Sequence, residues 1–209
     1  MAFEVSTQTL PAQGTITRLD QLDPNGFYTY GDYLRWRFTE WVELIKGHIW
    51  QMAAPSTKHG RVSLDLASVL NVKLKGQCTV FHAPFDVRLS TTNNYGEATT
   101  TVLQPDICVI CDKSKLDERG CAGAPSLVIE ILSPGSIRHD TVRKREAYAE
   151  GGVPEYWIVH PLDRYIEVLV LDGPSYKLHS VAVAEDGEAV TSATIAGLTV
   201  PLSEFLAVE

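Results

Sequence analysis

The sequence lacks any long hydrophobic run. No stretch of about 18 consecutive apolar residues occurs, which excludes a membrane-spanning helix of ordinary length. The first residues, MAFEVSTQTLPAQG, have neither the basic segment nor the apolar segment of a secretion signal. We therefore expect no membrane partner and, by default, a cytoplasmic location.

The sequence also lacks a basic surplus. Its formal net charge is −8, whereas proteins that hold nucleic acid by bulk electrostatics carry excess positive charge. Tight non-specific binding of nucleic acid is therefore disfavoured, although a local basic patch beside an acidic site is not. One such patch contains four cations and the single acid Asp140, and charge alone favours a solvated helix face for it: Arg138, Arg143, Lys144 and Arg145.

Cysteine is scarce, with four residues at positions 78, 108, 111 and 121. Cys108 and Cys111 form a C-x-x-C pattern, which is typical of zinc or redox sites. The surrounding QPDICVIC is typical of a buried strand, however, and residues three apart on a strand point to opposite faces. No second C-x-x-C is present. We expect reduced, partly buried thiols and no cysteine zinc site.

The composition that remains is that of an ordinary folded protein. Hydrophobic residues make up 44% of the 209 residues and charged residues 21%, which suits one domain with a sizeable core. Residues 1–26 contain prolines and glycines with little periodicity and predict an N-terminal arm. We expect residues 27–209 to form the single domain.

Patterning along the chain predicts more strands than helices. Lys46-Gly47 marks a hairpin turn within residues 41–53, and residues 55–74 have the apolar spacing of an amphipathic helix that begins near Ser56. We also expect short helices at 29–38 and 136–150 and a polar loop at 90–100. The predicted strands are residues 78–82, 85–89, 105–111, 126–132, 155–160 and 164–172. These elements predict an α+β fold with a mixed central β-sheet flanked by helices.

Two of these apolar strands carry a single acidic residue each. Asp106 follows Pro105 at the start of one strand, and Glu130 lies in the middle of SLVIEIL. An unpaired buried carboxylate costs several kcal/mol, so Glu130 needs a basic partner, a raised pKa or a cation shared with a second acid. Two acids on neighbouring strands favour the last, because hard divalent cations take oxygen ligands.

The helix expected after Glu130 adds a lysine to these acids. Asp140, Lys144 and Tyr148 are spaced at i, i+4 and i+8 and share one helical face. Lys144 can therefore lean back towards the carboxylates, although a surface pair with Asp140 is the alternative. Two carboxylates and a lysine are the parts that metal-assisted phosphodiester cleavage needs.

Several separate motifs resemble one protein family in their order and spacing. They are Y-T-Y-G-D-Y-L at 28–34, E-L-I-K-G-H-I at 43–49, P-S-x-x-H at 55–59, P-F-D-V-R-L at 84–89, P-D-I at 105–107, V-I-E-I-L-S-P at 128–134, K-x-x-x-Y at 144–148 and G-V-P-E-Y-W at 152–157. The sequence is similar to the Uma-type family of putative restriction endonucleases, a bacterial family of the PD-(D/E)XK nuclease superfamily. The resemblance covers residues 28–172.

The resemblance implies a restriction-endonuclease-like core and hydrolysis of DNA with Mg²⁺ or Mn²⁺. Asp106 and Glu130 would be metal-binding catalytic acids, with the Ile131 carbonyl as a further ligand. Glu43 matches an additional acid that binds the metal directly or through water. A homodimer is expected, because a double-strand cut needs two sites.

The lysine departs from the superfamily pattern. Many members carry it two residues after the second acid, where this sequence has Leu132. The resemblance implies that Lys144 takes this catalytic role from the following helix. It also implies that His59 and Tyr148 contact phosphate or water, and we expect Arg143 to point outward or to phosphate.

The missing lysine at position 132 and the net acidity keep other functions open. The main alternative is a catalytically inactive module that kept the nuclease fold for binding or assembly, and a small-molecule hydrolase with the same metal site is another. Elsewhere we expect structural roles. G-V-P-E-Y-W forms a turn and core, with a salt bridge as an equal alternative for Glu155, and His82 and His160 are satisfied strand histidines.

Overall fold

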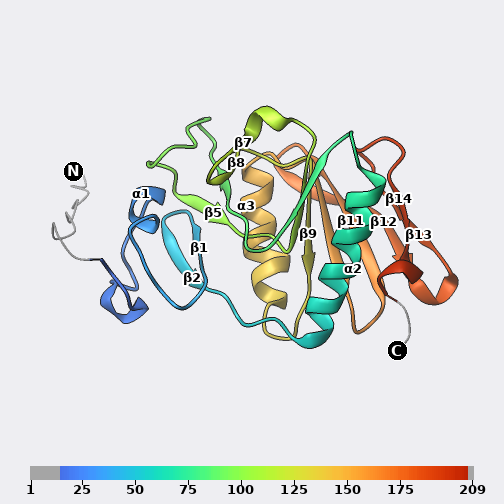
Figure 1. Ribbon diagram of the computed structural model, residues 1–209, viewed down its shortest axis with the longest axis horizontal. Helices are drawn as coiled ribbons and strands as arrows, with labels where there is room; N and C mark the ends of the chain where they lie inside the picture. Colours follow the sequence, from blue (N-terminus) through green and yellow to red (C-terminus); the bar gives the residue numbers. More distant parts are fainter. Residues whose placement is uncertain (1–14, 207–209) are drawn as a thin grey trace.

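The computed structural model describes residues 15–206, so the first fourteen residues of the predicted arm lie outside the described part. Two six-stranded sheets dominate this part, with helices beside them and a small two-stranded sheet near the C-terminus (Figure 1). The predicted α+β class is confirmed. Within residues 15–206, every helix is too short or too polar to cross a bilayer.

The central sheet has the strand order β12-β11-β10-β9-β6-β3. Only β9 and β10 pair in parallel, and the other neighbours are antiparallel, which makes the sheet mixed as predicted. Its strands are β3 (Thr79–His82), β6 (Ile107–Ile110), β9 (Leu127–Ile131), β10 (Glu155–His160), β11 (Tyr165–Asp172) and β12 (Ser175–Val183).

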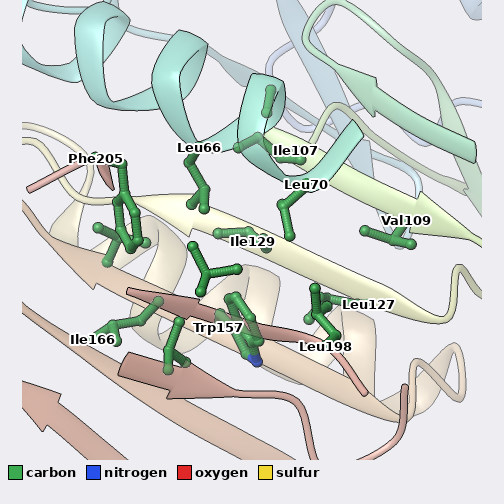
Figure 2. Packing of buried hydrophobic residues seen from close by; sticks show 14 of the residues in the cluster. Leu66, Leu70, Ile107, Val109, Leu127, Ile129, Trp157, Ile166, Leu198 and Phe205 are labelled. Atoms are coloured by element: carbon green, nitrogen blue, oxygen red, sulfur yellow. The ribbon is translucent and has the colours of Figure 1, made fainter. Parts of the chain in front are cut away.

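One face of the central sheet packs against α2 (Thr57–Lys73). Ser56 caps this helix by accepting a hydrogen bond from the His59 N–H, as its sequence predicts. Leu66 and Leu70 point from the helix onto the sheet and belong to the same buried cluster as Ile129 (Figure 2). The C-terminal elements complete this side: η4 (Ala184–Asp186), β13 (Ala189–Thr191), β14 (Thr199–Pro201) and η5 (Leu202–Glu204).

The second sheet, which we call the hairpin sheet, has the order β2-β1-β5-β4-β8-β7. The predicted hairpin is its first pair, and both turn residues, Lys46 and Gly47, have positive φ angles, as tight hairpin turns require. Three of its strands, β5, β7 and β8, are only two or three residues long and have no sequence signal. The strands are β1 (Val42–Ile45), β2 (His48–Gln51), β4 (Val87–Leu89), β5 (Thr101–Leu103), β7 (Leu116–Asp117) and β8 (Gly120–Ala122).

Short turns of helix flank the hairpin sheet. The predicted helix near residue 30 is confirmed as α1 (Tyr30–Tyr33), where Thr29 and Asp32 form a reciprocal capping box. The remaining turns are η1 (Leu19–Gln21) and η2 (Lys113–Lys115).

The helix between β9 and β10 differs from the regular one that the sequence predicts over 136–150. It begins with a π-helical stretch, η3 (His139–Lys144), and continues as α3 (Arg145–Glu150). Tyr148 packs from α3 onto the face of the central sheet opposite α2. This helix therefore lies between the central sheet and the hairpin β1–β2 (Figure 1).

The expectation of four reduced cysteines is wrong for two of them. Cys78 and Cys111 form a disulfide, while Cys108 and Cys121 are free and buried. The register explains the bond, because Thr79 pairs with Ile110, so the flanking Cys78 and Cys111 face each other across β3 and β6. Cys108 packs on the α3 side and Cys111 on the α2 side, which confirms that the C-x-x-C residues point to opposite faces.

Candidate functional site

Four charged side chains from three separate elements meet in the protein interior. Glu43 comes from β1, Glu130 from β9, and Asp140 and Lys144 from the π-helical stretch. Each of the four is at most 3% exposed. Such burial is rare for charged residues that lack partners, so their mutual contacts define the site.

Lys144 is the centre of this cluster. Its Nζ lies 3.0 Å from Glu43 Oε1, 3.1 Å from Glu130 Oε1 and 3.6 Å from Asp140 Oδ1. The alternative of a solvated surface lysine paired with Asp140 alone is therefore wrong. The lysine joins the hairpin sheet to the central sheet through two carboxylates.

Asp106 faces Glu130 across two neighbouring strands. Ile107 pairs with Ile129 in the antiparallel register of β6 and β9, which sets Asp106, one residue before β6, opposite Glu130. Asp106 Oδ2 accepts a hydrogen bond from the Ile131 N–H at 2.7 Å and lies 3.0 Å from His59 Nε2. The predicted adjacency of the two acids is thus present in the fold.

The predicted substrate-contacting residues lie in different places. His59 touches Asp106, and the hydroxyl of Tyr148 donates to Glu130 Oε1 at 2.7 Å. The guanidinium carbon of Arg143 lies 4.0 Å from the centre of the Trp50 ring. The first two residues therefore orient carboxylates, while Arg143 lies at the rim of the site.

Two groups in the site were missed by the sequence reading. His139 Nε2 lies 2.9 Å from Glu43 Oε2, and the Gln104 N–H donates to Glu43 Oε1 at 2.8 Å. These contacts join residues 96 and 61 positions apart, so no local pattern marks them. Both oxygens of Glu43 are engaged, which favours the water-mediated form of its predicted metal role.

The site is short of positive charge. Burial opposes ionisation of Glu43, yet Lys144 and His139 hold its pKa below the usual value. For Glu130, burial raises the pKa and the neighbouring acids raise it further, whereas Lys144 lowers it. The net result is a pKa well above the usual value. Burial likewise raises the pKa of Asp140. One lysine thus serves several buried acids, of which Glu43 benefits most.

Lys144 itself stays protonated. Burial opposes its charge, but the surrounding carboxylates raise its pKa well above the usual value. A lysine in this state donates hydrogen bonds and positive charge and does not accept a proton.

A divalent cation fits this chemistry as an open site. No hydrogen bond from residues 15–206 reaches Asp106 Oδ1 or Glu130 Oε2, so each acid keeps one oxygen for a further partner. Within the same residues, no three acidic, histidine or cysteine side chains form a ready-made cage. Mg²⁺ usually binds one or two carboxylates together with water and phosphate, so the two acids suffice as protein ligands.

Comparison with a solved structure supports the fold. A solved structure of a putative nuclease belonging to DUF820 from Anabaena variabilis ATCC 29413 superposes with a TM-score of 0.66 at 20% sequence identity. The alignment covers 86% of this chain and 97% of that chain, so the two share their fold.

One relative from Synechocystis sp. (strain ATCC 27184 / PCC 6803 / Kazusa), the uncharacterized protein slr1290, is 29% identical over 121 residues. The match spans 56% of this chain and 60% of that relative. The Uma2 family, described as "Putative restriction endonuclease", matches residues 31–208. Because this match takes in both sheets and all the residues of the buried cluster, the chain belongs to the Uma2 family of putative restriction endonucleases.

Proposed function

We propose that this protein is a metal-dependent endonuclease that hydrolyses DNA phosphodiester bonds. The observation that carries the proposal is the buried Lys144, whose ammonium lies between Glu43 and Glu130 while Asp106 faces Glu130 from the next strand. Perturbed acids and a lysine gathered in one place are typical of catalytic sites.

Each residue of the cluster has a distinct role in this proposal. Asp106 and Glu130 would hold Mg²⁺ or Mn²⁺, which polarises a phosphate and lowers the pKa of bound water. The Lys144 ammonium stabilises negative charge that develops on the phosphate. Tyr148 and His59 fix the orientation of the acids through their hydrogen bonds to Glu130 and Asp106.

The catalytically inactive alternative keeps one specific observation in its favour. Lys144 already bridges Glu43 and Glu130 and partly neutralises them without a metal. In that case the cluster stabilises the join between the two sheets, and the protein binds nucleic acid without cutting it. The homodimer and the cytoplasmic location remain predictions under both functions.

A cleavage assay tests the proposal. Plasmid, linear and single-stranded DNA are incubated with the protein in Mg²⁺, in Mn²⁺ and in EDTA. We expect cleavage only with metal, and a loss of about a hundredfold to a thousandfold in Asp106→Asn and Glu130→Gln, the range for removing one transition-state interaction. Glu146→Gln, an exposed acid on α3, is the matched control and should keep full activity.

Thermal unfolding separates the two functions. A ligand that binds only the folded state raises the melting temperature, so wild type should gain stability with Mg²⁺ and the two acid variants should gain little. Cleavage that persists in EDTA and in Asp106→Asn would overturn the metal mechanism. Intact metal binding without any cleavage would support the inactive module.

A further inference from the structure

We propose that Trp50, Arg143 and His139 form a stacking platform at the rim of the site that binds unpaired nucleobases. The preferred substrate is then DNA with a single-stranded segment, and not continuous duplex. This inference rests on the proposed nuclease function and specifies its substrate class.

The platform begins where the buried cluster ends. Glu43 and Trp50 are directly paired across the hairpin β1–β2, so their side chains lie on the same face of it. Glu43 is fully buried, whereas Trp50 is partly exposed. The hairpin therefore places one residue in the site and its partner at the surface.

Three planar groups lie together at this surface. The Arg143 guanidinium carbon is 4.0 Å from the centre of the Trp50 ring, and the His139 ring centroid is 5.7 Å from it, tilted by 44°. His139 Nε2 also lies 2.9 Å from Glu43 Oε2. A base on the platform would therefore lie beside the carboxylate of Glu43.

The chemistry of these groups matches a nucleobase. Aromatic rings and arginine guanidinium planes are the groups on which splayed-out bases stack. Trp50 and Arg143 are both only partly buried, so a base can stack on the guanidinium or take its place on the indole. Arg143 also brings a positive charge near the backbone phosphate.

The overall charge of the protein favours unpaired bases over duplex. With a net charge of −8, the chain gains little from releasing counterions along a duplex. In a duplex both faces of each base are covered by neighbouring bases, so a stacking platform has nothing to contact. An unpaired base offers a free face, and stacking does not depend on the net charge of the protein.

Fluorescence anisotropy of labelled DNA in EDTA tests the inference without any cleavage. We expect a single-stranded 20-mer to bind at least about tenfold more tightly than its duplex. Trp50→Leu and Arg143→Lys should weaken single-strand binding by about fivefold to a hundredfold, the effect of losing one stacked base. The conservative variant Trp50→Phe should retain most of the wild-type affinity. Arg138→Lys and Phe27→Leu, exposed residues outside the platform, are the matched controls and should bind as wild type does.

Because Trp50 also touches the core, thermal melts establish that the variants are folded. Equal or tighter binding of duplex, no binding of either DNA, or variants that bind like wild type would each overturn the inference. The outcome is distinct from that of the cleavage assay. Preferential single-strand binding without cleavage would contradict the nuclease proposal but support the stacking platform.

Discussion

Glu130 and Glu155 are two buried carboxylates on the neighbouring strands β9 and β10, and they are satisfied in opposite ways. Glu155 accepts hydrogen bonds from Trp157 Nε1 at 2.6 Å, from Ser192 Oγ at 2.7 Å and from Thr194 Oγ1 at 2.6 Å. It also accepts from the backbone N–H groups of Ala193 and Thr194. Within residues 15–206 no cation pairs with it, so the salt-bridge alternative for Glu155 is wrong.

Glu130, by contrast, has its described donors on a single oxygen and lies among like charges. Lys144 and Tyr148 both donate to Oε1, while Asp106 and Asp140 raise the pKa of Glu130 further. A carboxylate with a full set of neutral donors holds a loop in place. One that is left with a free oxygen and a charge deficit is ready for a cation.

The largest effect is expected when the lysine is removed from the charged cluster. Lys144→Met leaves Glu43 and Glu130 buried without their cation, so the free energy of unfolding should fall by about 3–5 kcal/mol. Urea unfolding at neutral pH measures it. Lys46→Met, which removes the exposed pair between Lys46 and Glu150, is the control and should cost less than about 1 kcal/mol. Similar losses in the two variants would mean that the buried carboxylates do not depend on the Lys144 cation.

A smaller effect is expected at Glu155, whose hydrogen-bond donors are all uncharged. Glu155→Gln keeps one amide oxygen but sets an NH₂ group against donors, which should lower the free energy of unfolding by about 1–3 kcal/mol. Because Glu155 lies outside the cluster, the same variant should keep metal-dependent cleavage per folded molecule. Glu130→Gln should show the reverse, with little loss of stability and almost no cleavage. If both variants behaved alike, the distinction between the two acids would fail.

The smallest effect concerns a third acid, Asp86, whose Oδ1 accepts from Tyr33 and Gln104. Burial raises the pKa of Asp86 despite these bonds. The folded state therefore binds this proton more tightly than the unfolded state, so the contribution is complete below the unfolded pKa of about 3.9 and is lost as pH rises through the folded value. Asp86→Asn should flatten the decline of the melting temperature over this pH range. An unchanged pH profile would contradict the assignment.

Local patterns predicted the elements that carry their own signal. The apolar spacing of α2 and its Ser56 cap, and the Lys46-Gly47 turn, appear in the structure as expected. The facing of Asp106 and Glu130 also follows from single acids in two apolar strands. In each case the decisive contacts join residues that are close in sequence or that stand out in an apolar run.

The features that the sequence did not reveal depend on contacts between distant segments. The strands β5, β7 and β8 are too short for a periodic pattern and form only through their neighbours in the hairpin sheet. The disulfide between Cys78 and Cys111 depends on the register of β3 and β6. His139 carries no sequence signal of a site, because a single histidine in a polar segment is common. Its partner Glu43 lies far away in the sequence, in the hairpin sheet.

The π-helical stretch at His139–Lys144 has a geometric consequence for the site. An α-helix turns by about 100° per residue, and a π-helical turn accommodates roughly one residue more than an α-helical turn. Side chains before the stretch are therefore rotated about the helix axis relative to the positions that a continuous α-helix would give them. Deleting one residue there would return the helix to a single phase and swing His139 out of reach of Glu43, while Tyr148 kept its place on Glu130.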